Sequence, residues 1–316
     1  MTLTRFTANR KLFFSGVGIC LATGALLALA IPNASHIITA AARVHPWIFA
    51  LTLVLGVAAL LLRSEVWRTC LEACGGETKR PDLYAANSFG MLGNAINHYV
   101  GPAVRVGTLR KIEPDSSPRP CQMFAADLPV LLTEASLATI LFATAVGAAG
   151  FPWWLPVAVF GGICFLLSGL WTLRRRLASK ALTLQGLNIM SSRVHMKRMI
   201  ICISLAVAFQ VIRTWLLLDG VGLHPAFWQV VMTFCATGVL GVLPLGPATS
   251  SGATLAVFSA QSTTAAAAAG MLLTGTAFAA AILFAIWGGI FLLRRSFRKA
   301  KEPVVAQESE LVPVLA

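Results

Sequence analysis

Charged residues are scarce in this sequence. Only 12% of its 316 residues are Asp, Glu, Lys or Arg, whereas 57% are hydrophobic. A soluble domain carries about 25% charged residues, so the composition excludes a soluble protein of this length. It fits a bundle of membrane-spanning helices instead. Residues 226–293 contain no charged residue at all.

Acidic residues are the rarer charged class, with 12 Asp and Glu against 25 Lys and Arg. The basic residues form short clusters between apolar runs, which is typical of the cytoplasmic rim of a membrane protein. The net charge of +13 is therefore not interpreted as a nucleic-acid signature. We expect membrane lipids, and no nucleic acid, among the partners.

Motifs for catalysis, or for binding a nucleotide or a metal, are also missing from the sequence. The sequence has no nucleotide-binding loop, no metal-ligand spacing and no catalytic triad, and the seven cysteines suggest no disulfide pair. His98 is an isolated histidine. We therefore expect no cofactor, no metal and no enzymatic activity.

What the chain does contain is a pair of similar stretches, residues 89–109 and 234–255. With a constant offset, Gly93 aligns with Gly238, and Gly101-Pro102-Ala103 aligns with Gly246-Pro247-Ala248. Such Gly- and Pro-interrupted segments in two halves of a membrane protein point to its binding site. Gly and Pro are also common in ordinary membrane helices, but the shared spacing favours a duplication.

The apolar runs predict the spans, and the basic clusters predict their orientation. Arginines and lysines flank the first interrupted stretch at both ends, which predicts a re-entrant hairpin that enters from the cytoplasm. The expected spans are residues 12–31, 47–62, 122–149, 157–173, 199–218 and 264–293, with an interfacial segment at 177–198.

Two arrangements fit the uncharged residues 226–262: a re-entrant hairpin from outside, or two further spans, 226–243 and a short 248–262. The hairpin is preferred because it makes the second half an inverted copy of the first. The expected fold is all-α, with about six to eight transmembrane helices in one domain over residues 1–300. The repeats would be 1–150 and 151–300, followed by a disordered tail, 301–316. Both termini would face the cytoplasm, in the cell inner (plasma) membrane.

Each interrupted stretch predicts a half-helix that begins deep in the membrane, because proline is tolerated in the first helical turn. Two such N-termini from opposite faces would form a site for an anion such as phosphate. The alternative is that the breaks only kink packed helices. The predicted substrate-binding residues are Asn94, Asn97, Gly101, Pro102, Arg105, Gly246, Pro247, Thr249, Ser250 and Ser251.

Two charges, Glu134 and Arg213, fall inside expected spans, where charges are rare and usually functional. The alternative is that they form a structural ion pair with each other. Arg63 and Trp67 end the second span, where they would anchor it at the interface or hold a lipid headgroup.

The interrupted stretches, the Arg63-x-x-x-Trp67 ending and the segment Pro247–Gly252 resemble the lysylphosphatidylglycerol synthase transmembrane region family. The resemblance covers most of residues 1–300. It implies a bacterial, flippase-like bundle with inverted repeats that moves a phospholipid or a lipid-linked glycan between leaflets. It also implies a stand-alone member without the synthase domain.

The sequence departs from that family where members often carry an acidic residue, because Thr108 and Thr254 stand there. A neutral or anionic lipid phosphate, or a polyprenyl-linked lipid, is therefore favoured over a cationic aminoacyl lipid. Three alternatives stay open: a membrane-embedded lipid-modifying transferase using Glu134, Asp127 or His98, a membrane partner of a cytoplasmic synthase or glycosyltransferase, and a small-solute transporter.

Overall fold

The computed structural model describes residues 38–39, 42–73, 78–96, 100–113, 119–150, 152, 154, 192–241 and 248–301. Within these residues the regular structure is helical throughout. Within this described part of the chain, four stretches are long and apolar enough to cross a membrane: Pro46–Ala73, Gln122–Ala148, Arg193–Gly220 and Thr263–Phe297.

These four stretches confirm the prediction of a helical membrane protein. They contain the expected spans at 47–62, 199–218 and 264–293, and nearly all of 122–149. The expected spans at 12–31 and 157–173 lie outside the described residues. Residues 193–198, assigned to an interfacial segment from the sequence, belong instead to a long helix, α9 (Arg193–Gly220).

The remaining long helices are α3 (Pro46–Ala73), α7 (Asp127–Ala148) and α12 (Thr263–Lys301). A short helix, α6 (Pro120–Ala125), leads into α7 and begins after the capping residue Arg119. The helices α3 and α9 pack along each other over much of their length. At one end of this contact the Cys70 and Met199 sulfur atoms lie 3.7 Å apart.

Four shorter helices form two pairs. The first pair is α4 (Arg80–Ile96) with α5 (Val100–Ile112), and the second is α10 (Phe227–Gly241) with α11 (Ala248–Phe258). Partners within each pair pack against each other. At 1.5 Å per residue each helix is at most about 26 Å long, shorter than the roughly 30 Å of a bilayer core.

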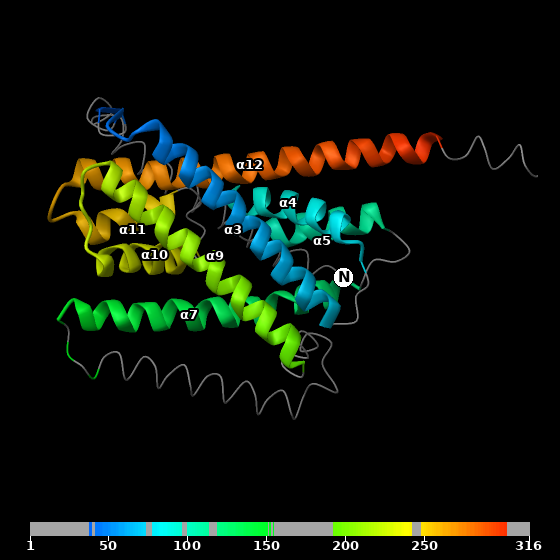
Figure 1. Ribbon diagram of the computed structural model, residues 1–316, viewed down its shortest axis with the longest axis horizontal. Coiled ribbons are helices and arrows are strands. Elements are labelled where there is room, and N and C mark those ends of the chain that lie inside the picture. The colour runs from blue at the N-terminus through cyan, green and yellow to red at the C-terminus, as the bar shows by residue number, and fades with distance from the viewer. Residues whose placement is uncertain are drawn as a thin grey trace, which may run out of the picture.

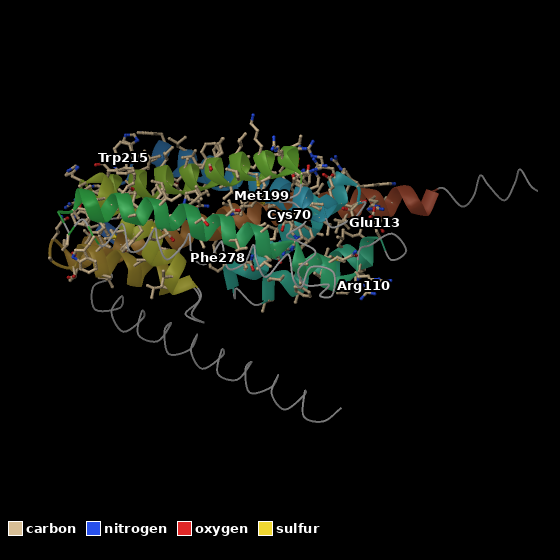
Figure 2. The ribbon with its side chains drawn as sticks, turned by 90° about the horizontal axis from the view of Figure 1, so that it is seen from below. Cys70, Arg110, Glu113, Met199, Trp215 and Phe278 are labelled. Atoms are coloured by element: carbon tan, nitrogen blue, oxygen red, sulfur yellow. The ribbon has the colours of Figure 1, made fainter. Side chains whose placement is uncertain are left out.

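The two pairs lie at opposite ends of the long axis, and α12 runs along both of them (Figure 1). Arg110 and Glu113 lie at the same end of the molecule as the α4/α5 pair, whereas Trp215 of α9 lies toward the other end (Figure 2). We call the first the basic end, because Arg68, Arg80, Arg198 and Arg295 form ion pairs there.

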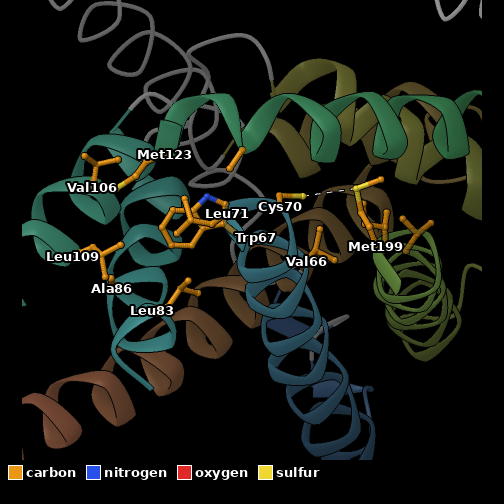
Figure 3. Packing of buried hydrophobic residues seen from close by; sticks show 13 residues of the cluster. Val66, Trp67, Cys70, Leu71, Leu83, Ala86, Val106, Leu109, Met123 and Met199 are labelled. Atoms are coloured by element: carbon orange, nitrogen blue, oxygen red, sulfur yellow. Dashed lines mark hydrogen bonds between the residues drawn. The ribbon is translucent and has the colours of Figure 1, made fainter. Parts of the chain in front are cut away.

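A hydrophobic cluster fills the basic end and joins α3, α4, α5 and α9 (Figure 3). Trp67 and Leu71 of α3 are its largest fully buried side chains, and Val106 and Leu109 of α5 pack into the same cluster. The cluster fixes the α4/α5 pair against the spanning helices by burial of apolar surface.

Candidate functional site within the helix bundle

The position of each short helix pair along the bundle can be given by the α12 residues that lie beside it. It runs antiparallel to α4, since Asp82 pairs with Arg295 and Ser88 lies against Gly288. By this register the last residue of α4, Ile96, reaches the level of Ala280. In the second pair, Ser251 lies against Gly270, which brings the first residue of α11 to the level of Leu273.

The inner ends of the two pairs are therefore separated by only seven residues of α12, or about 10 Å along its axis. Gly93 near the end of α4 also lies beside Gly101 at the start of α5, so the α5 N-terminus lies about one turn further along α12, roughly 15 Å from the α11 N-terminus. The first N–H groups of α5 and α11 are thus found at neighbouring depths of the bundle, where helix N-termini carry partial positive charge.

Arg213 of α9 lies at the same level. One of its terminal guanidinium nitrogens donates a hydrogen bond to the Leu273 carbonyl oxygen at 3.3 Å. A side-chain carbon added at Gly56 of α3 would lie 2.9 Å from Ala280 and 3.7 Å from the other terminal nitrogen of Arg213. The guanidinium is therefore held between α3, α9 and α12, bracketed by Leu273 and Ala280.

Arg213 is a buried cation without a neutralising carboxylate among the described residues. Only 7% of the residue is exposed, its Nε has no hydrogen-bond partner, and Arg63 adds a second positive charge within electrostatic reach. Residues 1–37 and 155–191 contain no Asp or Glu at all. A buried charge of this kind is costly unless something negative binds it.

Glu134 does not form an ion pair with Arg213, which corrects the alternative considered from the sequence. Its carboxylate pairs with Arg63 of α3 at 3.0 Å, and both side chains are about a third exposed or less. Asp127 lies two turns earlier on the same face of α7. The helix α7 thus presents two carboxylates to arginines from other helices.

Asp127 pairs with Arg105 of α5. The Arg105 guanidinium also lies 4.1 Å from the centroid of the Trp67 ring, and it donates to the Asn87 side-chain oxygen at 3.3 Å. The sequence predicted that Arg105 would bind a negative group of the substrate. In the structure its charge is balanced by a protein carboxylate, and binding of a substrate by Arg105 stays a prediction.

Trp67 is fully buried, with 1% of its surface exposed. A ring buried this deeply in protein does not itself contact a lipid headgroup, and its depth in the membrane stays a prediction. The ring provides an apolar face and a partial negative potential on which the Arg105 guanidinium lies. Arg63 likewise reaches a carboxylate of α7.

The other predicted binding residues divide into three groups. Gly101 and Pro102 lie in the first turn of α5 and Thr249 and Ser250 in the first turn of α11, at the level defined above. The side-chain oxygens of Asn94 and Ser251 are buried without a hydrogen-bond partner. Asn97, Gly246 and Pro247 lie outside the described residues.

One cluster of charged residues at the basic end was not predicted from the sequence. The Glu65 carboxylate accepts a hydrogen bond of 2.5 Å from the Tyr84 hydroxyl and pairs with Arg68, Arg80 and Arg198. Burial, and after it the hydrogen bond to Glu65, raise the pKa of Tyr84. The signal available in the sequence was an acidic residue, Glu65, close to basic residues. Its partners could not be identified from the sequence, because they come from three helices.

Neither a family model, nor a curated protein, nor a solved structure matches this chain. The assignment of a function therefore depends on the geometry within the bundle.

Proposed function

We propose that the protein is a flippase-like transporter that moves a lipid with a phosphate-bearing headgroup between membrane leaflets. The lipid would be a phospholipid or a lipid-linked glycan, the substrates that the resemblance to the lysylphosphatidylglycerol synthase transmembrane region family implies. The observation that carries the proposal is Arg213, a buried arginine that has no carboxylate partner among the described residues and lies at the level of both helix-pair ends.

In this proposal the two short helix pairs are re-entrant hairpins of an inverted repeat, entering from opposite membrane faces. Their lengths support it, because none of the four helices can cross a bilayer alone. The N-termini of α5 and α11 would then direct partial positive charge toward the headgroup phosphate. Arg213 would supply the full charge, and the acyl chains would stay in the bilayer.

The paired charges Arg63 and Glu134 have a role in the same mechanism. They form an ion pair that stays partly exposed, and Leu131, one turn earlier on α7, is 52% exposed. A headgroup that passes this pair could exchange with Glu134 for Arg63, and the partly exposed Glu134 carboxylate would then have to be stabilised by water. The termini would face the cytoplasm of the plasma membrane, where the basic end meets anionic lipid.

The test is translocation of labelled phosphatidylglycerol in proteoliposomes containing the full chain. We expect Arg213→Gln to slow translocation about tenfold or more, because a hydrogen bond to a charged group is worth about 1.5–3 kcal/mol. Arg213→Lys should retain part of the rate. Arg110→Gln at the exposed basic end is the matched control and should translocate normally.

A wild-type rate in the Arg213→Gln protein would contradict the proposal. Lipid recovered from the same assay should be chemically unchanged. A modified headgroup would instead support the alternative, a membrane-embedded transferase.

A further inference from the structure

A pocket separate from the mid-bundle site lies at the basic end, between the start of α4 and the last turns of α12. Its volume is about 340 Å³, and it is lined by Lys79, Pro81, Asp82, Phe291, Arg294 and Arg295. We call it the α4/α12 pocket. The residues from α12 stand at positions i, i+3 and i+4, which places them on one helical face.

The charges of the pocket are not balanced. Asp82 is its one acidic residue and already pairs with Arg295, which is also 3.9 Å from Glu113, the residue that follows α5. Lys79 and Arg294 are exposed, and within the described part of the chain neither forms an ion pair. The N-terminus of α4 at Arg80 adds partial positive charge. The pocket therefore attracts an anion through Lys79 and Arg294.

An apolar surface leads directly to these two cations. On α12, Ile286, Ile290, Leu293 and Phe297 are between 47% and 69% exposed, and Arg294 lies among them. Exposed apolar side chains on a membrane-spanning helix face acyl chains. Phe291 extends apolar surface into the pocket itself. The ligand that matches both features has an anionic head joined to apolar tails.

We propose that the α4/α12 pocket binds the headgroup phosphate of an anionic phospholipid, held by Lys79 and Arg294. The acyl chains then lie along the exposed apolar face of α12. The recognised group is a phosphate ester, and the apolar face selects a membrane lipid over a free phosphate. This inference is independent of the proposed transport activity, because it uses no residue of the mid-bundle site.

The experiment measures lipids retained by the purified full chain, using native mass spectrometry after mixing with phosphatidylglycerol or phosphatidylcholine. We expect selective retention of phosphatidylglycerol by the wild type. The double variant Lys79→Gln, Arg294→Gln should bind it about tenfold or more weakly, since each basic residue near the surface contributes about fivefold.

The matched control is Arg110→Gln, Lys111→Gln, which removes the same charge from exposed positions of α5 at the same end. Its retention of phosphatidylglycerol should equal that of the wild type. Because Lys79 and Arg294 are exposed, both double variants should fold. Phosphatidylglycerol should then raise the melting temperature of the control variant more than that of the pocket variant.

Three results would overturn the proposal. Equal losses in the two double variants would assign the binding to diffuse surface charge. Equal retention of phosphatidylcholine would exclude selection by the anionic headgroup. Displacement of the lipid by millimolar inorganic phosphate or glycerol 3-phosphate would show that the pocket recognises free phosphate rather than a lipid.

Discussion

The two short helix pairs have similar sequences but are held together in different ways. In the first pair, glycine allows α4 and α5 to touch: a side-chain carbon at Gly90 would lie 2.7 Å from the Arg105 Cβ, and one at Gly93 would lie 3.1 Å from the Gly101 Cα. Gly238, the residue of the second pair that aligns with Gly93, has nothing within 4 Å of that position.

In the second pair the closest glycine contact is to α12, where Gly270 allows close approach to Ser251 and Thr254 of α11, while α10 and α11 pack against each other with more space around their glycines. Charge differs as well. The first pair carries Arg105 with its partner Asp127, whereas α10 and α11 contain no charged residue. The shared Gly-Pro pattern thus predicts where one helix ends and the next begins. Whether a given glycine allows two helices to touch depends instead on how the helices pack.

The largest expected effect is a loss of stability when the buried Arg105 of the first pair loses its carboxylate partner. Asp127→Leu should lower the free energy of unfolding by about 3 kcal/mol, because it leaves Arg105 buried without its carboxylate. Denaturation in mixed detergent micelles measures the change. The double variant Arg105→Met, Asp127→Leu should recover most of the loss, since a well-packed apolar pair can replace a buried ion pair.

If the double variant were as unstable as Asp127→Leu alone, the loss would come from packing around Asp127 and not from an unpaired charge. A buried charge would then no longer explain why the first pair differs in stability from the uncharged second pair.

The next effect concerns the glycines within each pair. Gly101→Ala should destabilise the protein by about 2 kcal/mol, because the added carbon overlaps Asn94 and would lie 2.6 Å from the Gly90 carbonyl oxygen. Gly238→Ala should leave stability unchanged or raise it by up to about 1 kcal/mol, the intrinsic helix preference of alanine. Equal effects of the two variants, measured by the same unfolding assay, would remove the distinction between the pairs.

A smaller effect should appear where α12 holds the second pair. Gly270→Ala forces the Ser251 backbone away from α12 and should cost about 1–2 kcal/mol. Gly275→Ala on the same helix has open space around it and serves as the control, with stability unchanged or slightly raised. A stable Gly270→Ala protein would mean that α11 does not depend on α12.

The smallest effect concerns hydroxyl groups of α11. The Ser251 oxygen is buried without a partner, so Ser251→Ala should change stability by less than about 0.5 kcal/mol. The Thr254 hydroxyl donates to the backbone carbonyls of Ser250 and Ser251. Thr254→Ala should therefore cost about 1 kcal/mol. The same cost for both variants would indicate that Ser251 has a structural partner.

Much of the described fold could be predicted from the sequence, because span length and the placement of basic residues depend on local composition. The interruptions near Gly101 and before Ala248 were also predictable, since proline removes a backbone donor and glycine weakens a helix. The N-terminal extension of α9 through residues 193–198 was not, because those residues are polar and only their ion pairs and packing at the basic end favour a continued helix.

The partners of the charges were the part that sequence could not supply. The patterns selected Arg105, Glu134 and Arg213 as unusual residues, yet gave no means of choosing Asp127 for Arg105 or Arg63 for Glu134. Those choices depend on how α3, α5 and α7 are packed together. The burial of Trp67 was missed for the same reason, since an aromatic residue beside arginines is also typical of an interface.

The central claim, that an anionic lipid headgroup binds beside Arg213, can be tested directly by photo-crosslinking. A diazirine analogue of leucine would be placed at Leu273, next to the guanidinium, or at Ile286, which is 54% exposed on the outer face of α12. We predict that position 273 labels phosphatidylglycerol but not phosphatidylcholine, and only while Arg213 is present. Position 286 should label both lipids in either background. Labelling at 273 that is absent, or that is unchanged by Arg213→Gln, would contradict the account.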